Sequence, residues 1–273
     1  MTLAGVLGFP VAHSRSPAMM NAAFRTLGLD WRYLKLPVPP ERFEETVHAL
    51  PGSGYLGANV TVPHKLAALR LADEATEAAA AIGAVNTLSF SDGAIAAENT
   101  DAGGLLDALG SSPQGLRTLV LGAGGAGRAA AWALREAGAA EVCVWNRTPE
   151  RALELARDLG VRAVSAAAPA DLLVNATTVG LDPALHRDAA LAQLGLDRID
   201  PPATVVDLVY GGHVTPIAAW AAGAGARVVE GIEVLVHQGA RSLKSWTGRA
   251  APLEAMRAAA RGDGRERPPA EHL

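Results

Sequence analysis

The stretch of this sequence that decides the fold is Gly122-Ala123-Gly124-Gly125-Ala126-Gly127. A run with the composition of a buried strand, Leu119-Val120-Leu121, stands directly before it, and a strong helical sequence, 128–137, follows it. Such a turn is typical of dinucleotide-binding domains: its glycines permit the tight bend, the approach of a pyrophosphate and close packing of helix on strand. The helix N-terminus then offers unpaired N–H groups to the phosphates. We therefore expect a Rossmann fold that binds a dinucleotide, with a purely structural turn as the alternative.

The end of the next predicted strand indicates which dinucleotide is bound. That strand, Val142-Cys143-Val144-Trp145, leads into Asn146-Arg147-Thr148, where NAD-binding proteins usually place an acidic residue for the ribose hydroxyls. This chain has no acid there. Arg147 instead offers a permanent positive charge for a 2′-phosphate and a planar face for adenine, and Arg151 can add a second charge. NADP is therefore the expected cofactor, although either arginine alone could be a solvated surface residue.

Outward from this turn, short apolar runs alternate with segments of helical period along most of the 273 residues. This pattern is typical of strand–helix–strand units, so the expected class is α/β, and the length suits two lobes. We expect Ser16-Pro17 to open a helix with Ser16 as its N-cap, and Pro63 to open a short one. The expected strands are 3–8, 31–36, 55–60, 84–90 and 94–98 in a first series, and 118–121, 141–145, 163–165, 172–175 and 204–209 in a second.

The boundary between the lobes is expected near Asp101, before a connecting helix over 102–109 and the polar stretch 110–115. This division predicts a first domain over 1–101 and a dinucleotide-binding domain over 102–237. A last long helical pattern, 231–246, is expected to fold back, so that about 238–262 joins the first domain. The charged and proline-rich residues 263–273 are expected to form a frayed tail.

Composition narrows the possible functions. Hydrophobic residues make up 49% and charged residues 19%, which indicates a soluble globular protein. The net charge of -4 makes nucleic acid an unexpected partner. Cys143 is the only cysteine, which excludes an internal disulfide and a multi-cysteine metal cluster and fits a cytoplasmic setting. The N-terminus lacks the basic flank of a signal peptide, and no uninterrupted apolar run is long enough for a membrane span.

Polar residues gather at the ends of predicted strands in the first lobe, where ligands of open α/β sheets collect. Serine hydroxyls can donate to a carboxylate, Thr61 and Asn86 can pair with hydroxyls, and Lys65 with Asp101 offers a proton-transfer pair. These groups predict a site for a small polyhydroxylated acid. The alternatives are a helix cap for Ser16, a solvated lysine for Lys65 and a turn residue for Asn86. The four segments are His13-Ser14-Arg15-Ser16-Pro17, 59–65, 83–87 and 98–103.

These four segments, followed in order by the glycine turn and three later motifs, together resemble the shikimate dehydrogenase family. The resemblance covers about residues 5–250, and its combination of motifs is far more specific than any one of them. It implies reversible reduction of 3-dehydroshikimate to shikimate with NADPH, in the pathway to chorismate and the aromatic amino acids. It also implies a substrate lobe with a mostly parallel sheet, a Rossmann lobe, and a cleft between them. The later motifs are Asn146-Arg147-Thr148, Asn175-Ala176-Thr177-Thr178-Val179-Gly180 and Gln238-Gly239-Ala240.

The resemblance also implies roles for individual residues. Lys65 and Asp101 would be the catalytic pair. Lys65 would exchange a proton with the C3 oxygen, and Asp101 would orient Lys65. A lysine is protonated at neutral pH, which suits proton donation, and hydride passes directly from the nicotinamide, so no metal is expected. The implied substrate-binding residues are Ser14 and Ser16 with Tyr210 for the carboxylate, and Thr61, Asn86 and Gln238 for ring hydroxyls. The implied cofactor-binding residues are Gly122, Ala123, Gly124, Gly125, Ala126, Gly127, Asn146, Arg147, Thr148, Arg151, Thr177, Thr178, Leu208 and Gly231.

Three positions depart from the family pattern. Gly211-Gly212 replaces Asn-Pro after Tyr210, which predicts a more mobile loop on the cofactor side. Val234 replaces methionine and Leu243 replaces phenylalanine, and both exchanges are expected to reshape the pocket wall. The residues His13, His64, His186 and Cys143 are expected to be structural.

Two other functions remain open at this point. One is a family member that also oxidises quinate, with NAD, against which Arg147 argues. The other is a non-catalytic NADP-binding sensor, which would have no need for both Lys65 and Asp101. The assembly is expected to be a monomer or a homodimer, with no nucleic acid or membrane partner.

Overall fold

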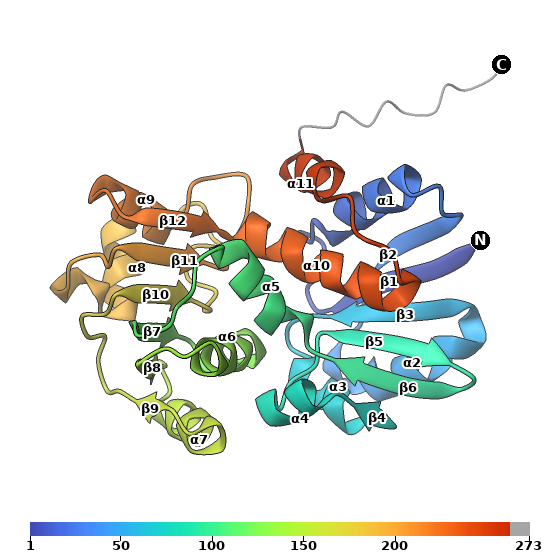
Figure 1. Cartoon of the computed structure of the whole chain (residues 1–273), viewed down its shortest axis with the longest axis horizontal. Coiled ribbons are helices and arrows are strands. Elements are labelled where there is room, and N and C mark those ends of the chain that lie inside the picture. Colours follow the sequence, from blue (N-terminus) through green and yellow to red (C-terminus); the bar gives the residue numbers. More distant parts are fainter. Residues whose placement is uncertain (263–273) are drawn as a thin grey trace.

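The computed structural model describes residues 1–262, which form two lobes, each built around a six-stranded sheet (Figure 1). The expected frayed tail, 263–273, lies outside the described residues. No helix within 1–262 is long and apolar enough to cross a membrane. The prediction of an α/β protein with two lobes is confirmed.

The first lobe is a mixed sheet with strand order β2-β1-β3-β5-β6-β4. The pairs β1–β2, β1–β3 and β4–β6 are parallel, whereas β5 runs antiparallel to both β3 and β6. Its strands are β1 (Thr2–Gly8), β2 (Trp31–Pro37), β3 (Tyr55–Val60), β4 (Glu74–Ala75), β5 (Thr87–Ser91) and β6 (Ala94–Glu98). Its helices are α1 (Ser16–Thr26), α2 (Phe43–Ala49), α3 (Lys65–Arg70), α4 (Glu77–Ile82) and the connecting α5 (Thr100–Leu109), with single 3-10 turns at Pro40–Arg42 and Pro51–Ser53.

The second lobe is an all-parallel sheet with strand order β12-β11-β10-β7-β8-β9. The order reverses between β7 and β10, which is the point where doubly wound sheets bind dinucleotides. Its strands are β7 (Arg117–Leu121), β8 (Glu141–Trp145), β9 (Arg162–Ala163), β10 (Leu172–Asn175), β11 (Thr204–Asp207) and β12 (Arg227–Glu230). Its helices are α6 (Gly125–Glu136), α7 (Pro149–Leu159), α8 (Arg187–Leu194) and α9 (Pro216–Gly223), with a 3-10 turn at Leu196–Arg198.

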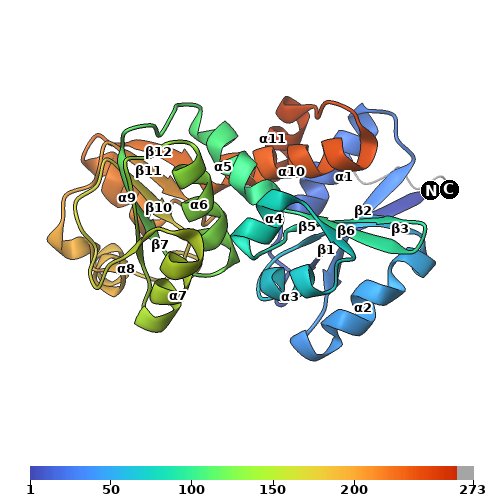
Figure 2. The same ribbon diagram turned by 60° about the horizontal axis from the view of Figure 1, so that its bottom comes forward.

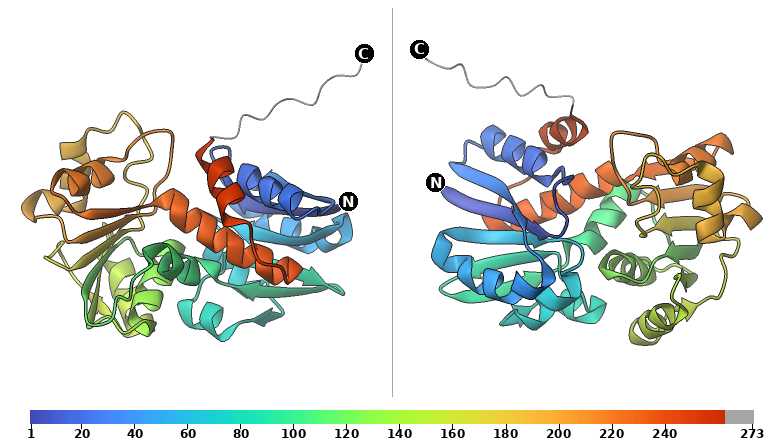
Figure 3. Two further views of the ribbon diagram at one scale, coloured as in Figure 1. Left: turned by 45° about the horizontal axis from the view of Figure 1, so that its top comes forward. Right: turned by 180° about the vertical axis from the view of Figure 1, so that it is seen from behind.

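The last two helices return the chain to the first lobe. They are α10 (Gly231–Thr247) and α11 (Leu253–Arg261). Figure 2 shows α1, α10 and α11 on one face of the first sheet and α2 and α3 on the other. Figure 3 shows α11 lying beside α1, and the two share one buried apolar cluster in which Met256 packs with Met19 and Met20.

The helices α5 and α10 cross closely where the two lobes meet (Figure 1). A Cβ on Gly104 would lie 2.6 Å from the backbone nitrogen of Gln238, so only glycine permits this crossing. The crossing brings Gln238 to the edge of the first sheet where β3 ends. A residue far along the chain is thereby placed beside residues of the first lobe.

Three expectations about local structure need correction. Helix α1 begins at Ser16 and its N-cap is Arg15, so Ser16 is not the capping residue. Pro63 precedes the N-cap of α3, His64, rather than opening the helix itself. The strand expected over 84–90 begins only at Thr87, because 83–86 form the connection that leads into it.

Candidate active site

A cavity of 330 Å³ lies between the lobes and draws its lining from both of them. All eight residues predicted to bind substrate line it, as do five of those predicted to bind the cofactor. The first group is Ser14, Ser16, Thr61, Lys65, Asn86, Asp101, Tyr210 and Gln238, and the second is Ala126, Thr177, Thr178, Leu208 and Gly231.

An ion pair between Lys65 and Asp101 lies at this cavity. Lys65 is the first residue of α3, after β3, and Asp101 is in the first turn of α5, after β6. The Nζ–Oδ2 distance is 2.5 Å, and the two side chains are only 13% and 17% exposed. A charged pair so well shielded from water is held firmly and interacts more strongly than one on the surface. The pair therefore presents an oriented ammonium group to the cavity.

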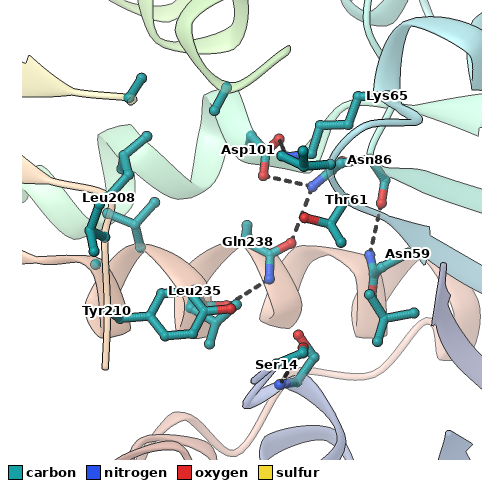
Figure 4. A pocket seen from close by; sticks show the side chains of 18 of the residues that line it. Ser14, Asn59, Thr61, Lys65, Asn86, Asp101, Leu208, Tyr210, Leu235 and Gln238 are labelled. Atoms are coloured by element: carbon teal, nitrogen blue, oxygen red, sulfur yellow. Dashed lines mark hydrogen bonds and ion pairs between the residues drawn. The ribbon is translucent and has the colours of Figure 1, made fainter. Parts of the chain in front are cut away.

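Asn86 connects this pair to α10 (Figure 4). Its Nδ2 donates to Asp101 Oδ1 at 2.8 Å and to Gln238 Oε1 at 3.1 Å. Its Oδ1 accepts the backbone N–H of Thr100 at 2.7 Å. Gln238 in turn donates through Nε2 to the carbonyl of Leu235 at 2.8 Å. Asn86 is thus a fixed side chain with several partners and not merely a turn residue.

The position of Asn86 differs from the one expected. It stands just before β5 rather than after a strand. Because β5 runs antiparallel to β3, the start of β5 lies at the same sheet edge as the end of β3. The residue therefore reaches the site from the opposite strand direction.

A buried polar network that sequence reasoning missed supports this edge of the sheet. Asn59 donates through Nδ2 to the carbonyl of Asn86, to Thr87 Oγ and to Ser242 Oγ at 3.1, 3.0 and 2.9 Å. The hydroxyl of Tyr33 donates to Asn59 Oδ1 at 2.7 Å, and burial raises the pKa of this phenol well above its usual value, so it stays a donor. The only signal in the sequence was a polar residue, Asn59, inside an otherwise apolar strand.

The serine hydroxyls predicted to hold a carboxylate lie across the cavity from Lys65 and Asp101, where α1 begins (Figure 4). Ser14 and Ser16 are buried, and Ser14 Oγ accepts the backbone N–H of Ser16 at 3.3 Å. Tyr210, in the segment after β11, lines the same side of the cavity. Burial has the largest effect on the pKa of the Tyr210 phenol and raises it, whereas Ser14 and Arg15 act to lower it. All three side chains are therefore neutral hydrogen-bonding groups.

The glycine turn has the geometry expected for Gly122, Gly124 and Gly127. Gly122 has a φ of +104°, which favours glycine. A Cβ on Gly127 would lie 1.9 Å from the carbonyl oxygen of Gly122, so helix and strand could not pack with any larger residue. A Cβ on Gly124 would meet nothing within 4 Å, which leaves room for a ligand against the backbone. The N–H of Ala123 is already bound by Asn146 Oδ1 at 3.0 Å, so Asn146 braces the turn.

The residues expected to read the 2′-phosphate lie after β8, beyond the lining of the cavity. Arg147 and Arg151 are both exposed, and α7 begins between them at Pro149. Thr148 is the N-cap of α7. An exposed pair of arginines at the end of β8 offers positive charge to a phosphate on the open side of the turn.

Of the two apolar departures from the family, only one reaches the cavity. Val234 lines it, as expected. Leu243 is fully buried in the cluster that α10 forms with α1, so the expectation that it shapes the pocket wall was wrong. Gly231 lets α10 begin against the end of β11, since its Cβ would lie 2.6 Å from the carbonyl oxygen of Leu208.

The histidines occupy different settings. His13 lines the cavity and is exposed. His64 is buried, stacks on Phe43 and hydrogen-bonds the carbonyl of Val38 at 2.7 Å; burial lowers its pKa, so its neutral form is favoured. Within residues 1–262, no three His, Cys, Asp or Glu side chains gather to hold a metal ion.

Three family models match successive parts of the chain. Residues 6–88 match the shikimate dehydrogenase substrate binding domain, residues 107–181 match shikimate / quinate 5-dehydrogenase, and residues 231–261 match the shikimate 5'-dehydrogenase C-terminal domain.

Individual proteins are similar over nearly the whole chain. The shikimate dehydrogenase (NADP(+)) of Methanothermobacter thermautotrophicus is 43% identical, over 92% of this chain and 93% of its own. That of Methanopyrus kandleri is also 43% identical, over 93% of each chain. The crystal structure of shikimate 5-dehydrogenase from Thermus thermophilus in complex with NADP(H) and shikimate is 42% identical, has a TM-score of 0.84, and covers 96% of this chain and 99% of that one.

Proposed function

The chain belongs to the shikimate dehydrogenase family, and we propose that Lys65 and Asp101 perform the proton transfer of its reaction. That reaction is the reversible, NADPH-dependent reduction of 3-dehydroshikimate to shikimate. The observation that carries the proposal is the 2.5 Å contact between Lys65 Nζ and Asp101 Oδ2 at a cavity lined with hydroxyl and amide groups. In this pair Lys65 donates the proton, while Asp101 fixes the direction of the ammonium group.

The cofactor site fits NADP. The open space at Gly124 leaves room for the pyrophosphate, and the N-terminus of α6 offers N–H groups to it. Arg147 and Arg151 are exposed where a 2′-phosphate is expected, and Asn146, rather than an acidic residue, directly follows β8. When bound, NADPH supplies the hydride, and the protein supplies orientation and the proton. Thr177, Thr178 and Gly231 line the second-lobe side of the cavity, which we assign to the nicotinamide.

Substrate is proposed to bind between Lys65 and the start of α1. Ser14 and Ser16 would donate to its carboxylate together with Tyr210, while Thr61, Asn86 and Gln238 would bind its ring hydroxyls. The groups that would bind the substrate carboxylate and those that would bind its ring hydroxyls lie on opposite sides of one cavity. Together they would fix the orientation of a small acid. The carbonyl oxygen then faces Lys65, which can donate its proton as negative charge develops on that oxygen.

We also propose how the chain divides between these tasks. Residues 1–101 with 238–262 form the substrate-binding and catalytic domain, and residues 102–237 form the NADP-binding domain. The packing of α10 and α11 on α1 supports this division. The cavity is lined by one copy of the chain, so a monomer or a homodimer would be complete, and the free, buried Cys143 fits a cytoplasmic enzyme.

The test is the rate of NADPH oxidation with 3-dehydroshikimate by purified protein and by Lys65→Ala. We expect the variant to lose about two or more orders of magnitude in kcat with a smaller change in substrate affinity, because a general acid is used only in the transition state. Lys244→Ala is the matched control, since Lys244 is exposed on α10 and does not line the cavity. An unchanged kcat in Lys65→Ala would remove the lysine from proton transfer.

Substrate and cofactor choice are tested by the reverse reaction. Shikimate and quinate are each supplied with NADP and with NAD, and shikimate with NADP is expected to give the highest kcat/KM. A higher kcat/KM for quinate would overturn the assignment of the cavity to shikimate.

A further inference from the structure

Gly125, the first residue of α6, lies against the stem of Lys65 from the opposite lobe. A Cβ on Gly125 would lie 2.8 Å from Lys65 Cβ and 3.0 Å from Lys65 Cδ, whereas ordinary contacts begin at 3.4 Å. Gly125 has no positive φ, so its backbone conformation does not demand glycine. What demands glycine there is the proximity of the lysine.

A second contact fixes α6 against the first lobe at the same place. Arg128, one turn along the helix, is 8% exposed and donates through Nε to the carbonyl of Ile82 at 2.6 Å. Its Nη2 donates to Asp158 at 2.9 Å, which anchors the guanidinium in the second lobe. Residues three apart share a face of a helix, so Gly125 and Arg128 touch the first lobe together.

A side chain at position 125 could not be accommodated by moving a flexible group. The nearest atom, Lys65 Cβ, is attached directly to the backbone of α3. That backbone is held by the Lys65 carbonyl, which accepts the N–H of Val85 at 2.8 Å. Either α3 or the spacing of the lobes must therefore shift by several tenths of an ångström, and the Nζ of Lys65 shifts with it.

We propose that Gly125 is a positioning residue for the reduction: its missing side chain sets the approach of the two lobes at which Lys65 meets both Asp101 and the substrate. This inference rests on the proposed role of Lys65. Adjacent glycines of one turn then have different tasks. Gly124 faces the open space for the pyrophosphate, and Gly125 faces the catalytic lysine of the other lobe.

The test compares Gly125→Ala with Gly124→Ala and with Gly223→Ala, which adds a methyl group to an exposed helical glycine with nothing within 4 Å. The rate of the chemical step is measured as single-turnover NADPH oxidation, and NADPH affinity by fluorescence titration. Gly125→Ala should slow the chemical step by about 10- to 100-fold, because misplacement of a catalytic group by a fraction of an ångström to 1 Å has effects of this size. Its NADPH affinity should change by less than about threefold, because alanine retains the N–H group.

The companion variants should behave differently. Gly124→Ala should weaken NADPH binding, since its methyl group enters the ligand space, and Gly223→Ala should change neither quantity. Alanine is a better helix former than glycine, so the melting temperature of Gly125→Ala should not fall by more than a few degrees. A Gly125→Ala enzyme with the full rate, or one that loses activity only through NADPH affinity, would overturn the proposal.

A double variant tests whether Gly125 acts through Lys65. In a Lys65→Ala background, adding Gly125→Ala should cost no further rate, because no amine remains to be misplaced. Multiplicative losses would overturn the coupling. If Lys65→Ala alone has the full rate, the proposed role of Lys65 fails; if Lys65→Ala is slow and Gly125→Ala is not, only the present inference fails.

Discussion

Replacing one nitrogen of Asn86 by oxygen should make the activity depend on pH in a way that the native enzyme does not. Asn86→Asp keeps the shape of the side chain and the oxygen that accepts the Thr100 N–H. The group that faces Asp101 Oδ1 at 2.8 Å and Gln238 Oε1 at 3.1 Å changes from a donor to an oxygen. In its ionised form, the new carboxylate oxygen would face these two acceptors, and within residues 1–262 the only donor near it would be the hydroxyl of Thr100, which lies 2.9 Å from the nitrogen it replaces.

The size of the effect follows from these distances. Two unit charges 2.8 Å apart repel by about 6 kcal/mol at an effective dielectric constant of about 20. Lys65, 2.5 Å from the other oxygen of Asp101, offsets part of this repulsion. The introduced carboxyl group should therefore keep a proton at neutral pH and donate it to Asp101 as the amide did. When that proton leaves at higher pH, Asp101 and Lys65 should be displaced and kcat should fall by about 100-fold.

The assay is kcat for NADPH oxidation from about pH 6 to pH 9, with the variant divided by the native enzyme at each pH so that shared ionisations cancel. The ratio should decline as pH rises. Asn86→Ala is the control, because it can neither donate nor ionise and should be slow at every pH. A ratio for Asn86→Asp that is constant with pH, or an Asn86→Ala enzyme with native kcat, would refute the reasoning.

Two further predictions concern the cofactor and the stability of the fold. Arg147→Ala should raise KM for NADP by about tenfold or more and leave KM for NAD nearly unchanged, because a charged hydrogen bond to the 2′-phosphate is worth about 1.5–3 kcal/mol. Initial rates measured with each cofactor test this prediction. Equal losses with the two cofactors would exclude a role for Arg147 in binding the 2′-phosphate. His64 has a folded-state pKa below its ordinary value of 6.5 because it is buried, so the free energy of unfolding should be level above that pH and fall as pH drops through 6.5 toward the lowered value. Urea unfolding on both sides of this window, with His64→Gln as the variant that lacks the ionisation, should show the decline only in the native protein.

The parts of the site that could be predicted are those whose chemistry is local in the sequence. The glycine turn has a strand before it and a helix after it, and this local context gives separate steric reasons for Gly122, Gly124 and Gly127. The reason for Gly125 is its contact with Lys65 of the other lobe, which the local sequence does not show. Lys65 and Asp101 stand where predicted strands end, and the rule that ligands collect at strand ends placed them in one region. Short strands such as β4, of two residues, and β12, inside an alanine-rich segment, carry too little pattern to be recognised.

Strand direction limited the prediction for Asn86. A short apolar run has the same composition whether it pairs parallel or antiparallel, so the reversal of β5 could not be read from the residues. If β5 had been parallel to β3, its start would lie at the opposite edge of the sheet from the end of β3. The rule that ligands collect at carboxyl ends would then have placed Asn86 at the wrong edge. Asn86 reaches the site because the strand is reversed and the residue stands before it rather than after it.

The contacts between distant segments explain why the site is assembled only in the complete fold. Asn59 on β3 and Ser242 on α10 are 183 positions apart and hydrogen-bond at 2.9 Å. The same helix crosses α5 at Gly104 and thereby delivers Gln238 to Asn86. A buried polar group left without its partner costs about 1–3 kcal/mol, so displacement of α10 would break several such bonds together. The return of α10 therefore does more than cover the first sheet: it ties the orientation of Asn86, and through it Asp101 and Lys65, to the position of the second lobe from which α10 starts.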